Sequence, residues 1–192
     1  MEFVCLSMAT WLFFIDTRLV WNTHSRIPKE VAQQHIDTLS AFTPILKVSD
    51  TVNAKQTAVQ PKPTDDLDTV DEVAIRALVL GVNYRRLGRY AAARNLLLEA
   101  HQYPLTLSTW VGGVALFELA VLELKEMEES SITLTDDAER KKTWAAVLKS
   151  ATGHLDQALS LSTNAVDLSG RLDSRIGMLR DQISIKKEAL GI

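Results

Sequence analysis

The chain has 192 residues and a formal net charge of −3, with 46% hydrophobic and 23% charged residues. This length is sufficient for one domain with a substantial core, and the composition is typical of a globular protein. The charge balance gives no electrostatic reason to expect nucleic-acid binding, which requires a concentrated basic face. A single cysteine, Cys5, excludes an internal disulfide framework.

The first segment, residues 2–21, is apolar on most sides, which predicts a helix buried between neighbours. Residues 3–15 within it carry no charge, but this run is shorter than the ~20 apolar residues that span a bilayer. Glu2 is acidic, whereas a signal peptide begins with basic residues. We therefore predict neither a transmembrane span nor a signal peptide.

Pro28 suits the first turn of a second helix, which we expect to continue to about residue 46 unless Pro44 ends it earlier. The two helices form a predicted N-terminal hairpin over residues 1–48.

The next segment, residues 49–66, contains two prolines and almost no large apolar side chains. Such a segment buries too little surface to become ordered, so we predict a flexible loop. Asp65 and Asp66 are predicted to cap the helix that follows.

A helix–turn–helix pattern occupies residues 80–104, with a first helix ending at about Leu87 and a second over 89–102. Gly88 lies at the turn, where we expect a backbone conformation that is costly for other residues. Small residues allow the two helices to pack closely and large residues fill the space between hairpins, as in a tetratricopeptide repeat. The residues at repeat positions are Gly81, Tyr84, Gly88, Tyr90, Ala93, Leu97 and Ala100.

A second, longer pair of helices follows. Trp110 and Phe117 lie in its first helix, and an acidic stretch (123–129) and a polar loop (130–137) are expected between its helices. Asp136 or Asp137 is predicted to cap a long helix that ends at about residue 161. This helix repeats the spacing of Ala93, Leu97 and Ala100 in Ala151, Leu155 and Ala158.

The last predicted helix begins near Asn164, and apolar residues along it recur every three or four positions. We therefore predict an all-α fold: a right-handed stack of antiparallel helical hairpins of about seven helices, with repeats over 67–192 and a closing amphipathic helix. The apolar face of that helix has Leu168, Leu172, Ile176, Leu179 and Ile183, and the opposite face has Arg171, Asp173, Arg175, Arg180, Asp181 and Lys187.

No catalytic pattern is recognisable. No histidine pairs with a second ligand at helical spacing, the glycines are not followed by a phosphate-binding Gly-Lys-Ser/Thr, and no nucleophile motif surrounds a serine. The sequence thus favours a non-enzymatic protein without metal or cofactor. The histidines are His24, His35, His101 and His154.

Two groups of residues are candidates for partner binding. Arg85, Arg86, Arg89 and Arg94 form either a clamp for a carboxylate or acidic segment, or a solvated helix face that pairs with Glu99 or its neighbours. The tryptophans either line a sterol or lipid pocket or pack between hairpins; they are Trp11, Trp21, Trp110 and Trp144.

Several blocks in a fixed order carry a resemblance to a known family. The most specific are FELAVLELKE (117–126) and LDSRIGMLRDQI (172–183), which follow LGVNYRRLGRYAAARNLL (80–97). Together they resemble the carboxy-terminal part of the fungal inclusion-body clearance proteins and of their animal relatives, the tetratricopeptide repeat protein thirty-nine family. Members are much longer, so we expect this chain to lack a helical region that precedes these blocks.

The resemblance implies a non-enzymatic adaptor that takes part in lipid-droplet-mediated clearance of protein inclusions after folding stress. It implies lipid-droplet proteins as partners, and a location in cytoplasm and nucleus or peripherally at lipid droplets or the mitochondrial outer membrane. The family provides no catalytic motif to transfer to this chain. The alternatives are a sterol or lipid carrier and a general peptide-binding repeat scaffold.

Overall fold

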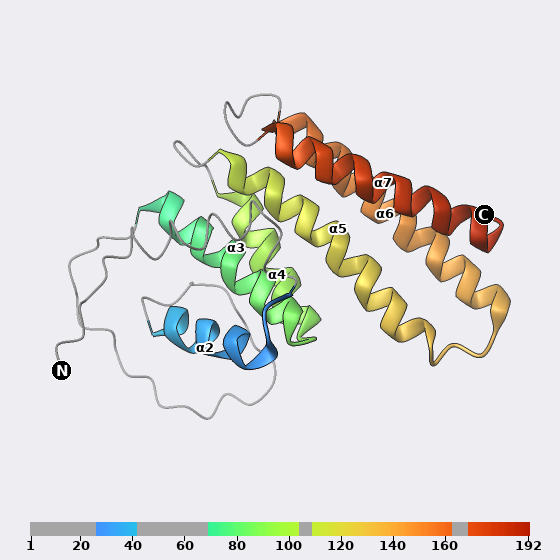
Figure 1. The fold of residues 1–192 in the computed structure, drawn as a ribbon, viewed down its shortest axis with the longest axis horizontal. Helices are drawn as coiled ribbons and strands as arrows, with labels where there is room; N and C mark the ends of the chain where they lie inside the picture. Colours follow the sequence, from blue (N-terminus) through green and yellow to red (C-terminus); the bar gives the residue numbers. More distant parts are fainter. Residues whose placement is uncertain (1–25, 42–68, 104–108, 163–168) are drawn as a thin grey trace.

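Helices account for all the regular secondary structure in the described part of the chain. The computed structural model describes residues 26–41, 69–103, 109–162 and 169–192, and these ranges hold six α-helices and no strand (Figure 1). The predicted all-α class is thereby confirmed for these ranges. The predicted opening helix (2–21) and loop (49–66) lie outside them. The helices are α2 (Lys29–Ser40), α3 (Val70–Arg86), α4 (Tyr90–Gln102), α5 (Trp110–Ser131), α6 (Asp137–Ser162) and α7 (Ser169–Leu190).

Helix α5 occupies the centre of the arrangement. It contacts α3, α4, α6 and α7, and every residue from 111 to 120 within it is buried. Figure 1 shows α5, α6 and α7 side by side, with α2 on the other side of the molecule, packed against α3. One cluster of buried apolar side chains extends through all six helices, so burial of these side chains is the main stabilising contribution.

Helix α3 begins with a complete capping box. The side chain of Thr69 accepts a 3.3 Å hydrogen bond from the backbone N–H of Glu72, and the Glu72 carboxylate accepts one of 2.7 Å from the N–H of Thr69. Together these bonds satisfy two N–H groups at the helix start. The cap is therefore Thr69 and not Asp65 or Asp66, which lie outside the described residues.

The turn between α3 and α4 depends on Gly88, which has a φ of 76° as the sequence predicted. Its N–H donates to the carbonyl of Arg85, and the N–H of Arg89 donates to that of Tyr84, both at 3.0 Å. This is the Schellman pattern, which satisfies the last carbonyls of a helix and requires a residue with positive φ. The chain therefore reverses into α4 within three residues, 87–89.

Close packing of α3 on α4 depends on a second glycine. A Cβ added at Gly81 would lie 2.8 Å from Cγ of Leu97, whose side chain is fully buried. The repeat residues Ala93 and Ala100 on α4 are also fully buried. Small residues thus lie at the interface between α3 and α4.

The second pair of helices differs from the expectation in one respect. The acidic stretch 123–129, expected between helices, belongs to α5, which continues to Ser131. The reason is that apolar residues continue at helical spacing through the stretch, with Leu122 and Met127 buried. Helix α6 begins at Asp137, and the carboxylate of Asp136 accepts a 3.0 Å hydrogen bond from the N–H of Ala138. The repeat residues of α6, namely Ala151, Leu155 and Ala158, are fully buried.

Two other boundaries also differ. Helix α2 ends at Ser40 rather than near residue 46; Pro44, which lacks a backbone N–H and restricts the residue before it, follows shortly in the sequence. Helix α7 begins at Ser169, and its predicted start at Asn164 lies outside the described residues.

Candidate functional site

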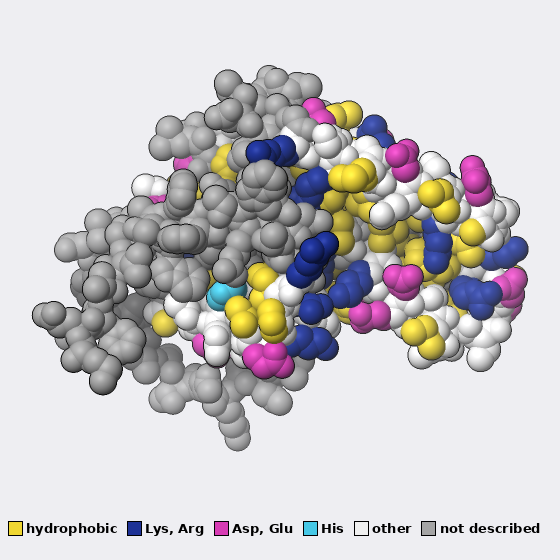
Figure 2. Space-filling view, viewed as in Figure 1, with side chains coloured by type: hydrophobic (Ala, Val, Ile, Leu, Met, Phe, Trp, Pro, Cys, Tyr) yellow, Lys and Arg dark blue, Asp and Glu magenta, His cyan; other side chains and the backbone are white. Residues whose placement is uncertain are grey.

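A pocket of about 360 Å³ lies between α3, α5 and α7. Its lining combines apolar side chains with an unusual number of charged ones. Figure 2 shows Lys and Arg side chains gathered near the middle of the face where α3 and α4 meet α5, beside apolar side chains. The lining residues are Val82, Arg85 and Arg86 from α3, Phe117, Glu118, Val121 and Lys125 from α5, and Arg175, Met178, Leu179 and Gln182 from α7.

Glu118 is the buried centre of this site. Its side chain is 0% exposed, and it lies within the apolar run 111–120 of α5. Nη2 of Arg85 lies 2.7 Å from Oε2 of Glu118, and Nη2 of Arg175 donates a 2.8 Å hydrogen bond to Oε1. Removing a carboxylate from water is costly unless such partners compensate it. The two ion pairs therefore join α3 and α7 to the central helix.

Arg175 makes a second contact within the pocket. Its guanidinium carbon lies 4.2 Å from the centre of the Phe117 ring, within the range of a cation–π interaction. Its side chain is only 11% exposed. The sequence placed Arg175 on the outer, polar face of the last helix, and this placement is wrong. The reason is that the long arginine side chain reaches past the apolar face of α7 to the carboxylate on α5.

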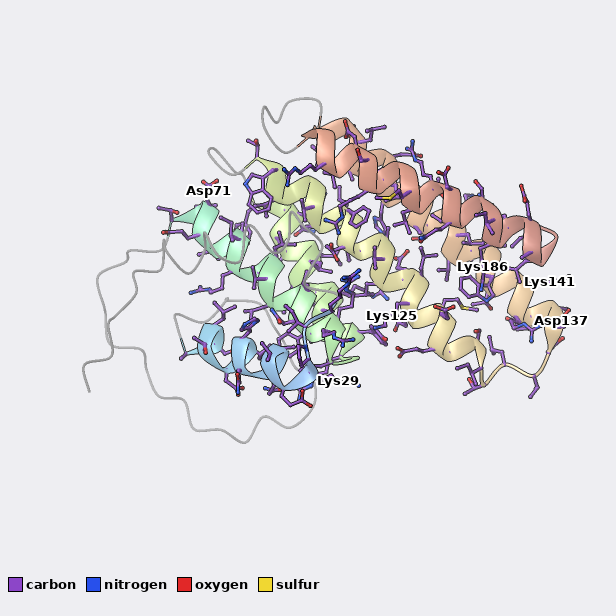
Figure 3. All side chains as sticks on the ribbon, in the orientation of Figure 1. Lys29, Asp71, Lys125, Asp137, Lys141 and Lys186 are labelled. Atoms are coloured by element: carbon purple, nitrogen blue, oxygen red, sulfur yellow. The ribbon has the colours of Figure 1, made fainter. Side chains whose placement is uncertain are left out.

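The other two cations of the lining have no carboxylate partner among the described residues. Nε of Arg86 donates a 2.6 Å hydrogen bond to the carbonyl of Ile27, which attaches the start of α2 to the end of α3. Lys125 is half-buried and projects from α5 at the side facing the ends of α3 and α4 (Figure 3). Four cationic side chains and one carboxylate line the pocket, so its lining has a net charge of +3. In a chain whose total is −3, this is a local concentration of positive charge that attracts anions.

The four predicted arginines do not form one cluster. Arg85 and Arg86 line the pocket. Arg89 is exposed and lies over the ring of Tyr84, 5.8 Å from its centre. Arg94 pairs with Glu123 and Glu126 of α5, and not with Glu99. The structure therefore brings two of the four together and adds Lys125 and Arg175, which sequence reasoning did not select.

One signal in the sequence does indicate this site. Glu118 is the single charged residue in the run 111–122, which is otherwise apolar or glycine. A charge at such a position on a buried helix requires a cationic partner. The sequence gives no means of choosing that partner, because Arg85 and Arg175 lie 33 residues before and 57 residues after Glu118.

A second polar cluster joins α4, α5 and α6 outside the pocket. Nη1 of Arg94 and Nε2 of His154 each lie 3.3 Å from Oε1 of Glu123. Burial alone would raise the pKa of Glu123, but the hydrogen bonds from His154 and Ser150 and the charges of His154 and Arg94 outweigh it and lower this pKa. The carboxylate is thus held ionised as part of the interface between these helices.

The tryptophans within the described ranges are not part of the pocket lining. Trp144 is buried with the Lys186 ammonium 4.4 Å from its ring centre, and Trp110 packs against the core. Trp11 and Trp21 lie outside the described residues. Within the described ranges, no group of three or more His, Cys, Asp or Glu side chains is arranged to hold a metal ion.

None of the helices in the described ranges combines the length and the hydropathy that a membrane-spanning segment needs. Comparisons of the chain with protein-family models, with curated proteins and with solved structures gave no match.

Proposed function

We propose that this chain is a non-enzymatic helical-repeat adaptor that binds another protein at the pocket between α3, α5 and α7. The observation that carries the proposal is the net charge of +3 on a pocket that also has an apolar lining. Such a site provides charge complementarity to an anionic group and burial for an adjacent apolar group. Phe117 and Val121 supply the apolar side, and Lys125 and Arg86 supply cations that no described carboxylate neutralises.

The repeat architecture is part of the same proposal. Helices α3 and α4 pack through Gly81 and turn at Gly88, and the repeat residues of α6 are buried against their neighbours. These features support two tetratricopeptide-like hairpins in a right-handed stack, with α7 as the closing helix. Stacked hairpins of this kind present extended surfaces for protein partners.

The cellular role that we propose rests on the family resemblance of the sequence blocks. It is an adaptor role in lipid-droplet-mediated clearance of inclusion bodies after folding stress, with lipid-droplet proteins as partners. The location that accompanies this role is cytoplasm and nucleus, with peripheral attachment to lipid droplets or the mitochondrial outer membrane. A sterol or lipid carrier has less support, because the pocket lining is cationic and contains neither Trp110 nor Trp144.

Affinity capture with mass spectrometry tests the proposal. The 192-residue chain and its Lys125→Glu variant are captured from cells under folding stress, with Lys141→Glu as the matched control. Lys141 is exposed on α6, at the far end of the helix from the pocket (Figure 3). We expect the chain and the control to recover lipid-droplet and inclusion proteins, and Lys125→Glu to lose them.

Equal recovery by all three proteins would place partner binding outside the pocket. Absence of lipid-droplet and inclusion proteins from every capture would remove the adaptor role.

A further inference from the structure

Two walls of the pocket, α5 and α7, run in the same direction. Glu118 of α5 is bonded to Arg175 of α7, and seven residues further along each helix Lys125 and Gln182 both line the pocket. From Glu118 to Lys125 helix α5 rises about 10 Å, at roughly 1.5 Å per residue. The pocket is therefore a short trough whose two ends can be compared.

The two ends of the trough differ in how their charges are used. At the first end, the buried Glu118 carboxylate binds two arginines whose side chains are only 8% and 11% exposed. At the second end, Lys125 is half-buried and Gln182 is exposed, and no carboxylate of the described residues neutralises the lysine. Arg86 adds a further positive charge from α3. An anionic group of a ligand is therefore attracted to the second end.

Apolar side chains occupy the trough between these ends. Val121 and Leu179 are half-buried, and Met178 at the rim is 60% exposed. Val121 precedes Lys125 by four residues, which is about 6 Å along the axis of α5. A ligand that satisfies both features has an apolar group beside Val121 and an anionic group roughly 6 Å away.

We propose that the pocket binds an extended segment of a partner protein in which a large apolar residue and an acidic residue are two positions apart. In an extended chain such residues point to the same side, about 6.6 Å apart at roughly 3.3 Å per residue. The apolar side chain lies against Val121 and Met178, and the carboxylate lies at Lys125. This inference rests on the proposed adaptor function and specifies its partner class.

An extended segment fits better than a bound helix. The pocket has a volume of about 360 Å³, at the small end of the range for ligand sites. A short helix is only marginally stable in water and needs apolar contacts along several turns to stay folded. The apolar lining of the trough is confined to its middle, between two polar ends.

Fluorescence anisotropy with three short synthetic peptides of equal composition tests the spacing on the 192-residue chain. Each has one central leucine and a glutamate on either side of it, placed one, two or four positions away among serines. The symmetry makes the direction of the bound peptide irrelevant. A neutral fluorophore and a terminal amide remove the charges of the peptide ends.

We expect the peptide with glutamates two positions from the leucine to bind most tightly. Glutamates next to the leucine point to the other side of an extended chain, and those four positions away lie about 13 Å from it. Both of these peptides are expected to bind at least about fivefold more weakly. Replacing the leucine with serine is expected to weaken binding about tenfold or more, because the apolar contact is lost.

Variants of the chain locate the binding surface. Met178→Asp is expected to weaken the best peptide about tenfold or more, and Ile185→Asp is its control, since Ile185 is 65% exposed on the same helix but does not line the pocket. Lys125→Glu is expected to weaken binding about fivefold or more, and Lys141→Glu to leave it unchanged. A peptide with lysines in place of the glutamates is expected to bind Lys125→Glu more tightly than the unmodified chain. Circular dichroism confirms that each variant keeps its helix content.

Several outcomes would overturn the inference. They are absence of binding by all three peptides, equal binding of the three, and unchanged binding by Met178→Asp. Tightest binding by the peptide with glutamates four positions away would assign the pocket to a helical partner, because that is the spacing of one helical turn. Displacement of the peptide by laurate, with laurate binding lost in Met178→Asp, would assign it to a small amphiphilic anion. If no peptide binds but Lys125→Glu still loses the proteins captured from cells, the adaptor function stands and only the proposed segment is wrong.

Discussion

The guanidinium of Arg175 on α7 donates a 2.8 Å hydrogen bond to the carboxylate of Glu118, which is completely buried on α5. Arg85 on α3 lies 2.7 Å from the other oxygen of the same carboxylate. One glutamate therefore joins three helices and shares its charge between two arginines. Because a buried ion pair gains little net stability over apolar packing, its main effect here is to fix the relative positions of these helices. The pocket that we propose as the binding site is built on this arrangement.

Replacing Glu118 with alanine is expected to lower the free energy of unfolding by about 3–5 kcal/mol, because two buried guanidinium groups lose their shared carboxylate. Urea denaturation at neutral pH measures the change. Glu128→Ala is the control, since Glu128 is an exposed glutamate on the same helix, and it is expected to change stability by less than about 0.5 kcal/mol. Equal effects of the two substitutions would show that the buried triad contributes no more than an exposed charge.

Two glycine-to-alanine substitutions are expected to have opposite effects. In Gly81→Ala the new Cβ would meet Leu97 at 2.8 Å. Overpacking costs about 1–3 kcal/mol, which exceeds the gain of at most about 1 kcal/mol in helix propensity. In Gly153→Ala no atom lies within 4 Å of the new Cβ, so only the gain remains. We expect the first to lower and the second to raise the free energy of unfolding, both measured by urea denaturation; a stabilising Gly81→Ala would show that α3 and α4 separate easily.

Substitution of Gly88 tests the turn between α3 and α4. Its φ of 76° is costly for residues with a Cβ, while nothing lies within 4 Å of the position that a Cβ would take. Gly88→Val is therefore expected to destabilise by more than about 1 kcal/mol through the backbone alone. Gly88→Asn is expected to cost less, since asparagine tolerates this conformation better. Thermal melting curves that coincide for the chain and the valine variant would contradict this role for the glycine.

The parts of the fold that sequence could predict depend on local signals. The glycine at the turn after α3 and the apolar residues of α4 and α6 at repeat spacing lie within single helices or hairpins. Their consequences follow from backbone geometry and helical periodicity. The end of α5 is harder to predict from sequence. The acidic stretch 123–129 resembles a connection by composition, but its buried residues, such as Met127, continue the helix.

The pocket could not be predicted in the same way. Lys125 and Arg175 have the sequence context of solvated helix faces, and only the packing of α7 against α5 brings them together. Arg89 and Arg94, which are close to Arg85 in sequence, face other surroundings because the chain reverses at Gly88, which leaves Arg89 in the turn and Arg94 on α4. The neighbouring positions of Arg85 and Arg86 in the sequence thus predicted two of the four cations of the pocket, and not Lys125 or Arg175.

The lowered pKa of Glu123 predicts acid sensitivity. The folded state holds its carboxylate ionised below the ordinary pKa of 4.5. Its contribution to stability is therefore present above that value and is lost as the pH falls through the folded pKa. Glu123→Gln is expected to show a flatter dependence of the urea midpoint on pH below about 4.5 than the unmodified chain. Parallel pH profiles of the two proteins would show that His154 and Arg94 do not hold this carboxylate ionised.

His101 predicts a second pH dependence at a higher pH. Burial lowers its pKa below 6.5, repulsion from His154 adds to the shift, and a hydrogen bond with the Gly112 backbone opposes it. Below pH 6.5 the unfolded chain takes up a proton that the folded chain resists. The contribution of neutral His101 to stability is therefore fully present above that pH and decreases as the pH falls toward the folded pKa. Stability changes in this direction because the unfolded state binds more protons than the folded state.

His101→Gln removes this proton uptake. We expect the unmodified chain to lose more stability than the variant between about pH 7 and pH 5.5, because only the unmodified chain carries the histidine. Urea midpoints at the two pH values measure the difference, and the imidazole resonance of His101 in an NMR titration reports its pKa directly. A titration midpoint at or above 6.5 would contradict the burial of the ring between α4 and α5. Equal losses of stability in the two proteins would show that the acid sensitivity in this range arises from other groups.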